Sequence, residues 1–176
     1  AVHLTADTDE IEDDEPFHFD PLGTWALYNR TLTLAEPALI RDPTADVGAL
    51  LTAVAAQLRD RGELPLPPFD AHWAAWIADQ LAPALHDYAA QLAAHPEALR
   101  PSEVRVEGGR VRLLDRLEQL RHAADRDTRL ILRLSASKVL KVTNNRAEFE
   151  WHNLVRYWPT HLAAQIAGPT RTRLLG

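Results

Sequence analysis

The hydrophobic periodicity of this chain changes near residues 96–102. Upstream of that point, over residues 47–58 and 73–92, apolar residues recur three and four positions apart, which is the spacing of one helix face. Downstream, apolar and polar residues alternate in two runs on either side of Gly108 and Gly109, and two adjacent glycines allow the positive φ angles of a tight hairpin turn. Helical and strand patterns in separate stretches predict an α+β fold, here a predominantly helical domain with a small antiparallel sheet or hairpin.

Two helices have the clearest patterns. Asp42 and Pro43 suit the cap and the first position of one helix, and Gly62 suits its end. Asp70 suits the cap of a second helix, which extends to about residue 94 and which Pro83 should kink or divide. The expected core faces are Val47, Leu50, Leu51, Val54 and Leu58 in the first helix, and Trp73, Ile77, Leu81, Ala84, Leu85, Tyr88 and Leu92 in the second.

The other segments divide into strands and short helices. Residues 25–34 are rich in aromatic and β-branched residues and predict a strand or short hairpin, and residues 129–136 alternate as a strand does. Asp115 and Glu118 resemble a capping box that opens a short helix to about residue 124. A helix over residues 146–158 and a short one over 160–167 are expected before a loose tail. The first of these would turn four residues toward the core: Trp151, Leu154, Val155 and Trp158.

The charge is divided unequally along the chain. Residues 1–100 carry 17 Asp and Glu against 5 Lys and Arg, a net charge of −12, whereas residues 101–176 carry 8 acids against 14 bases, a net charge of +6. Such asymmetry indicates an acidic tail and a basic part that binds a partner. Residues 1–20 form the expected acidic arm, and residues 21–176 form a single globular domain, with a sub-boundary near 96–102 as the alternative. Eight carboxylates and no base lie in the arm: Asp7, Asp9, Glu10, Glu12, Asp13, Asp14, Glu15 and Asp20.

Composition excludes several classes of protein. The chain has no Cys, which excludes disulfides, thiolate zinc sites and a cysteine nucleophile. It has no apolar run long enough to span a membrane, and its acidic start is the reverse of a signal peptide. A cytoplasmic protein with no membrane partner is therefore expected.

The expected helix over 146–158 carries a candidate nucleic-acid-binding face opposite its apolar side. Arginine binds phosphate or guanine, asparagine can pair with adenine, and an exposed aromatic ring can stack on a base. The candidate nucleic-acid-binding residues are Arg146, Phe149, His152, Asn153 and Arg156, together with Arg133, Lys138 and Lys141 upstream. Residues 136–158 also fit a helix-turn-helix with its turn at 143–145. The alternative is that Phe149 packs under a neighbouring element and the polar residues only face solvent.

No group of residues points to catalysis or to a metal ion. His72, Asp79 and His86 recur every seven residues, a rise of about 10.5 Å, so they cannot share one ion. Glu148 and His152 are spaced four residues apart and could bind a metal ion together, but two ligands do not make a metal site. The serines Ser102, Ser135 and Ser137 lie in no nucleophile elbow, and the glycines form no phosphate-binding loop. We therefore expect no catalytic residue, no metal site and no cofactor, although carboxylate and histidine sites need no local motif.

Three functions remain open. The first is a non-enzymatic binding module whose basic half contacts an acidic partner, with DNA or RNA as the first candidate and the acidic arm as an intramolecular competitor. The second is a protein-interaction subunit of a larger assembly, in which another chain docks on the arm or on the tryptophan-rich helices. The third is a small hydrolase-type enzyme without a recognisable motif.

Overall fold

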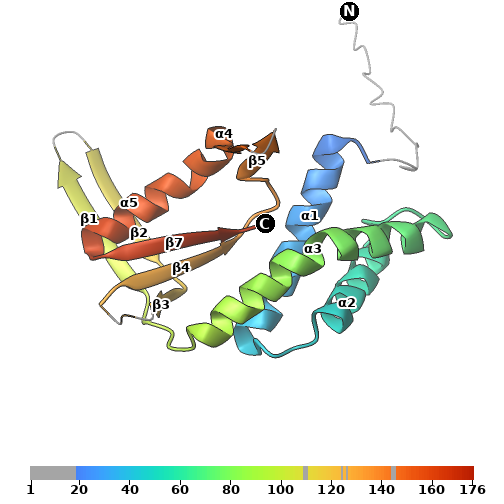
Figure 1. Ribbon diagram of the computed structural model, residues 1–176, viewed down its shortest axis with the longest axis horizontal. Coiled ribbons are helices and arrows are strands. Elements are labelled where there is room, and N and C mark those ends of the chain that lie inside the picture. Colours follow the sequence, from blue (N-terminus) through green and yellow to red (C-terminus); the bar gives the residue numbers. More distant parts are fainter. Residues whose placement is uncertain (1–18, 109–110, 124, 126, 144–145) are drawn as a thin grey trace, which may run out of the picture.

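The chain folds into a helical half followed by a half built from strands and short helices. The computed structural model describes residues 19–108, 111–123, 125, 127–143 and 146–176. Helices α1 (Pro21–Arg41), α2 (Val47–Asp60) and α3 (Phe69–Ala94) pack side by side, and the strands and α5 (Trp158–Ala167) lie beyond the end of α3 (Figure 1). The α+β prediction is confirmed.

The prediction of a strand over residues 25–34 is wrong, because these residues lie inside α1. The buried side chains of α1 recur at helical spacing, and Leu27, Thr31, Ala35 and Leu39 are among them. The Thr31 hydroxyl donates to the Leu27 carbonyl at 2.8 Å, four residues back. Such a bond lets a β-branched residue remain in a helix. Residues 25–34 thus have a composition typical of strands but form a helix, because the helix buries one of their faces in the core.

Helices α1 and α2 are each capped at the N-terminus by the side chain of an aspartate that directly precedes the helix. The Asp20 carboxylate accepts from the Gly23 amide at 2.6 Å at the start of α1, and the Asp46 carboxylate accepts from the Ala49 amide at 2.7 Å at the start of α2. The expectation that Asp42 caps the helix that ends near Gly62, which is α2, is wrong, because Asp42 instead accepts from Thr44 in the preceding turn. Asp70 lies in the first turn of α3 rather than at its cap, and α3 continues through Pro83 without dividing.

The expected hairpin around Gly108 is confirmed. Strands β1 (Ser102–Gly108) and β2 (Val111–Leu117) pair antiparallel, with Val104 opposite Asp115 and Gly108 opposite Val111. The capping-box helix is wrong, because Asp115 lies in β2 and β3 (Leu120–His122) follows directly. β3 pairs antiparallel with β4 (Arg129–Leu134), which pairs parallel with β7 (Thr170–Leu175). The tail expected to be loose is thus an ordered strand.

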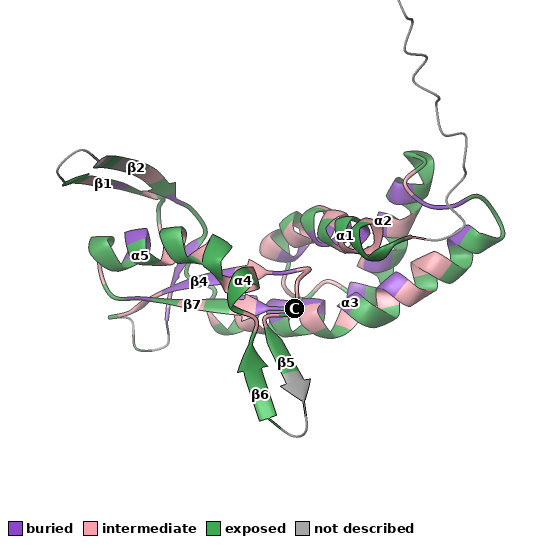
Figure 2. Ribbon diagram, turned by 90° about the horizontal axis from the view of Figure 1, so that it is seen from above, coloured by how far each residue is buried: buried purple, intermediate pink, exposed green. Residues whose placement is uncertain are grey.

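The helix expected over 146–158 is wrong in its first part. Strands β5 (Leu140–Thr143) and β6 (Arg146–Phe149) form an antiparallel hairpin, so the helix-turn-helix alternative is wrong too. Helical structure starts with α4 (Trp151–Leu154), passes through a 3-10 turn, η1 (Val155–Tyr157), and continues as α5. The β5–β6 hairpin projects from the rest of the molecule (Figure 2). Alternation along residues 146–149 supports pairing with β5 once a turn brings the strands together.

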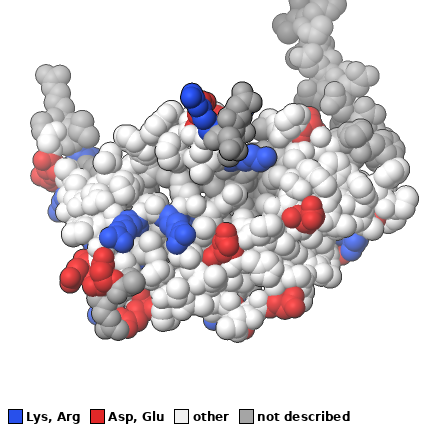
Figure 3. Space-filling view, in the orientation of Figure 1, with Lys and Arg blue, Asp and Glu red and all other residues white. Residues whose placement is uncertain are grey.

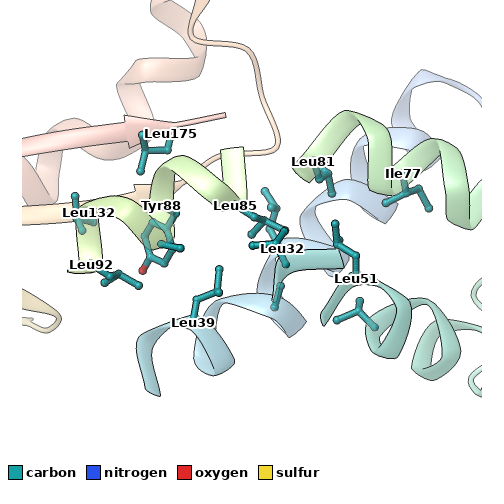
Figure 4. Packing of buried hydrophobic residues seen from close by; sticks show 14 of the residues in the cluster. Leu32, Leu39, Leu51, Ile77, Leu81, Leu85, Tyr88, Leu92, Leu132 and Leu175 are labelled. Carbon is teal, nitrogen blue, oxygen red and sulfur yellow. The ribbon is translucent and has the colours of Figure 1, made fainter. Parts of the chain in front are cut away.

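One core connects the helices to the sheet. The side chains of Leu39, Leu85 and Leu92 are almost completely buried between α1 and α3, and Leu132 and Leu175 from β4 and β7 belong to the same cluster (Figure 4). A second, smaller cluster fills the space between α5 and the sheet. Its buried members are Val104, Leu117, Leu120, Ile131, Ala163 and Ala164. Helix α3 therefore contributes to packing against both the other helices and the sheet.

The predicted core positions divide by element. Ile77, Leu81 and Leu85 of α3 are buried as expected, and Trp73 is half-buried against Phe19, with ring centroids 4.8 Å apart. Residues 1–18, which hold most of the expected acidic arm, lie outside the described residues. The expectation that the helix after residue 150 buries its apolar side is wrong: Trp151, Val155 and Trp158 are exposed and Leu154 is only half-buried.

Leu85→Ala should lower the free energy of unfolding by about 2–5 kcal/mol, because it leaves a cavity in a fully buried site. The measurement is a urea denaturation curve. Leu162→Ala is the matched control: Leu162 is about half exposed, so its loss should change the free energy by no more than about 0.5 kcal/mol. Equal effects of the two changes would contradict the assignment of the core.

A partly buried ion pair joins α2 to the start of α3. The Arg59 Nε donates to Asp70 Oδ2 at 2.5 Å, and Asp70 is buried. This hydrogen bond, aided by the Ala71 amide, lowers the pKa of the Asp70 carboxyl against the opposing effect of burial. A carboxyl whose pKa is lower in the folded state stabilises the fold above its unfolded pKa, and this stabilisation is lost as the pH falls through the folded pKa.

We expect Asp70→Asn to destabilise the protein most at neutral pH. The difference from the parent chain in denaturant midpoint should shrink as the pH falls below about 4, where the parent carboxyl also becomes protonated. Asp60→Asn, at the exposed end of α2, is the control and should leave the midpoint nearly unchanged. A difference for Asp70→Asn that stays constant from pH 7 to pH 3 would show that the ion pair is not the cause.

Candidate nucleic-acid interface

The β5–β6 hairpin carries the base-rich end of the candidate site. Lys141 lies opposite Glu148, and Arg146 lies two positions from Glu148 along β6, so these three residues share one face of the hairpin. Leu140 and Phe149 are opposite each other on the other face. The hairpin thus presents two bases and one acid on one side and two exposed apolar side chains on the other.

A depression of about 720 Å³ lies between this hairpin and the first turn of α4. We call it the basic depression, and its lining residues are Lys138, Leu140, Lys141, Glu150, His152 and Asn153. The Asn153 side-chain amide donates to the Lys138 carbonyl at 2.9 Å, which fixes the β4–β5 connection against α4. Of the candidate nucleic-acid-binding residues, Lys138, Lys141, His152 and Asn153 therefore meet in one place.

The charge of the depression is positive when its internal contacts are counted. Within the part of the chain that the structure describes, neither Lys138 nor Lys141 forms an ion pair, so both ammonium groups are available. The one carboxylate in the lining, Glu150, lies 3.4 Å from His152 Nδ1 and pairs with that ring when it is protonated. Two lysines without an ion pair thus lie near one carboxylate of the lining, Glu150, and Glu148 opposite Lys141 is a second carboxylate on the hairpin.

Two aromatic rings lie beside the depression. Phe149 at the end of β6 is 56% exposed, and its ring centroid lies 5.4 Å from that of Trp151. The alternative that Phe149 packs under a neighbouring element is therefore not what the structure shows. Exposed aromatic faces beside lysines form the combination that single-stranded nucleic acid binds, through stacking and backbone charge together.

Two of the candidate arginines point elsewhere. Arg156 Nη2 donates to Ser135 Oγ at 3.0 Å and to Tyr157 OH at 2.7 Å. Ser137 Oγ accepts from the Trp25 indole at 2.9 Å, so this polar junction links η1 to α1. Arg133 in β4 donates to Gln119 Oε1 at 2.6 Å. These arginines hold structure together rather than line the basic depression.

The bases of the second half are spread over the molecule. Arg121 is buried and donates to the carbonyl of His95, Arg129 donates to the carbonyl of Ala164, and Arg116 pairs with Glu118 at 3.2 Å. Figure 3 shows basic side chains in separate places on one face, over β7 and near β5, rather than as one continuous patch. The net charge of +6 therefore overstates the charge of any single surface.

Sequence reasoning missed an exposed apolar surface. Five side chains along α4, η1 and α5 form what we call the apolar seam: Trp151 (60% exposed), Val155 (63%), Trp158 (53%), Leu162 (53%) and Ile166 (61%). A signal was available in the sequence. The ten residues of α5 contain no Asp, Glu, Lys or Arg, and such a helix is expected either to be fully buried or to meet a partner.

The described residues hold neither a metal site nor a membrane span. No three His, Asp or Glu side chains in the described ranges are placed to share a metal ion. Among the same residues, no helix has both the length and the apolar character needed to cross a bilayer.

Comparison with known families gives one match. The family model described as the RecC C-terminal domain matches residues 1–174. RecC is related to DNA repair and recombination as part of RecBCD, so the match indicates association with nucleic acid or with a larger assembly. No curated protein matches the sequence of this chain.

Proposed function

The chain belongs to the RecC C-terminal domain family, and from this we propose that it is a non-enzymatic module of a DNA-processing assembly that contacts nucleic acid at the basic depression. The observation that carries the proposal is the meeting of Lys138, Lys141, His152 and Asn153 around one cavity. The family supplies the class of partner, and the depression supplies the surface for it.

The chemistry of the depression favours the backbone and unpaired bases. Lys138 and Lys141 in the depression, and the exposed Arg146 further along the β5–β6 hairpin, supply three cations for phosphates. Phe149 and Trp151 supply two rings on which unpaired bases can stack, at about 1–3 kcal/mol for each base. The Asn153 side-chain amide already donates to the Lys138 carbonyl, so we propose binding that is independent of sequence and stronger for single strands than for duplexes.

Three phosphate contacts set the expected dependence on salt. The logarithm of the association constant falls with the logarithm of salt concentration by about 0.7 for each phosphate contact on a single strand. Three contacts would therefore weaken binding about 20-fold between 50 and 200 mM salt. Such modest affinity suits one module of an assembly that holds DNA at several places.

Lys138→Ala and Lys141→Ala should each reduce the steepness of this salt dependence by about 0.7 for single-stranded DNA. The measurement is a fluorescence anisotropy titration of the chain with a labelled oligonucleotide at several salt concentrations. Arg105→Ala is the matched control, because Arg105 is an exposed base on the separate β1–β2 hairpin. If Arg105→Ala weakens binding as much as the lysine variants, the contact is not localised to the depression.

The acidic arm is proposed to compete for the same depression. The hydrogen bond from Trp25 to Ser137 puts the first turns of α1 beside Lys138. Asp20, at the cap of α1, lies only about 7.5 Å of helix rise from Trp25. A tether this short gives the seven carboxylates among residues 1–18 a high effective concentration near the lysines.

Deleting residues 1–18 should raise the affinity for single-stranded DNA, and the gain should be largest at low salt, where screening is weakest. Titrations of the full chain and the shortened chain at 50 and 300 mM salt test this. The shortened chain keeps Phe19 and Asp20, so the packing on Trp73 and the cap of α1 are retained. Equal affinities at low salt would remove the competitor role and leave the depression itself as the proposed site.

A further inference from the structure

The apolar seam has the pattern of a helix-pairing surface. Its residues follow one another at spacings of four, three, four and four, and at 100° per residue the three that belong to α5, Trp158, Leu162 and Ile166, fall within an arc of about 80°. The first four positions keep the alternating three-and-four spacing of a coiled-coil seam. A helix that only covers its own protein core has a wider apolar face, and that face is buried.

The helix that carries the seam is already anchored on its opposite side. Ala163 and Ala164 are buried in the small core against the sheet, and His161 Nδ1 lies 3.0 Å from Thr172 Oγ1 of β7. Arg156 points toward Ser135, away from the seam. The opposite side of α5 thus already packs against the sheet, and the seam faces outward. Figure 2 shows most of α5 as exposed.

The seam is comparable in size to the largest exposed apolar patch of a typical soluble monomer. Aromatic side chains present about 150–250 Å² each, so the half-exposed Trp151, Trp158 and neighbouring Phe149 alone leave roughly 300 Å² of apolar surface in water. Val155, Leu162 and Ile166 extend that surface. A typical soluble monomer exposes a few hundred Å² in its largest patch, and such patches mark interaction sites.

Charge identifies the kind of partner. Residues 151–176 contain no Asp or Glu, so nothing on the seam-bearing helix repels an acidic partner. The charged residues of the basic depression lie at the Trp151 end of the seam, where Lys138 and Lys141 outnumber the one carboxylate of the lining, Glu150. A partner should therefore be apolar along α5 and acidic where it reaches the hairpin.

We propose that the apolar seam is a docking site for one amphipathic helix of a partner protein, about fifteen residues long, with acidic residues at the end that lies over the β5–β6 hairpin. The length follows from the span between Trp151 and Ile166, which is about 22 Å of helix. The narrow arc fits a single helix better than a sheet or an extended peptide. This surface and partner do not depend on nucleic-acid binding at the depression.

The test uses the full chain and two synthetic peptides. Both are helical 18-residue peptides with leucine at the heptad a and d positions, and they differ only in one terminal turn, which carries three glutamates in one and three lysines in the other. Binding is followed by the fluorescence of the protein's tryptophans. We expect the glutamate peptide to bind at least tenfold more tightly than the lysine peptide. Equal binding would overturn the acidic partner, and no binding of either would overturn the docking site.

Substitutions locate the binding. Leu162→Glu, which places a charge in the middle of the seam, should weaken binding of the glutamate peptide at least tenfold with an unchanged denaturant midpoint. Ala167→Glu adds the same charge at an exposed position of α5 outside the seam and should leave the affinity within twofold. Retained binding by Leu162→Glu would overturn the proposal. So would a concentration-dependent dimer, seen by sedimentation, that Leu162→Glu abolishes, because the occupant would then be a second copy.

Discussion

The packing of α3 against two different partners is the constraint on which the rest of the structure depends. Its apolar residues pack against α1 and α2, and near its end the same core includes Leu132 of β4 and Leu175 of β7. The Tyr88 hydroxyl donates to Glu36 of α1 at 2.9 Å, and burial together with this carboxylate raises the pKa of Tyr88. Because α3 packs against the other helices and against the sheet, it joins the two halves of the molecule. The last strand, β7, completes the sheet by pairing with β4.

This arrangement decides which elements remain outside the core. β4 and β7 are neighbours in the sheet, so residues 135–169 form a long excursion that leaves the sheet after β4 and returns at β7. Within the excursion only Ala163 and Ala164 are deeply buried among the hydrophobic side chains that the structure describes. Small residues at those positions let α5 lie close to the sheet, and its larger side chains face outward. The basic depression and the apolar seam both belong to this excursion, as recognition sites commonly belong to segments held by a rigid scaffold.

Much of the fold could be predicted from local patterns, and the failures have a physical cause. Helices α2 and α3 and the β1–β2 hairpin could be predicted because their periodicities agree with their burial. Residues 25–34 misled because threonine and aromatic residues favour strands in isolation, whereas a helical face of Leu27, Thr31 and Ala35 was required by the core. The tail from Thr170 could not be predicted as a strand, since its pairing partner lies about forty residues earlier, in β4.

The candidate site shows what periodicity leaves undecided. An apolar stripe at helical spacing predicts that one face of a helix packs against another surface. It does not indicate whether that surface belongs to the same chain or to a partner. Trp158 and Leu162 have the pattern of core residues and nevertheless face outward, because the inward face of α5 is already filled by two alanines. The lysines of the depression lie at one end of the same segment, so an acidic helix on the seam and a nucleic acid in the depression would meet at Trp151. Two ligands that share an edge influence each other's affinity reciprocally. Under the two proposals, a partner helix on the seam would change the affinity of the depression for DNA without any change in the fold of this domain.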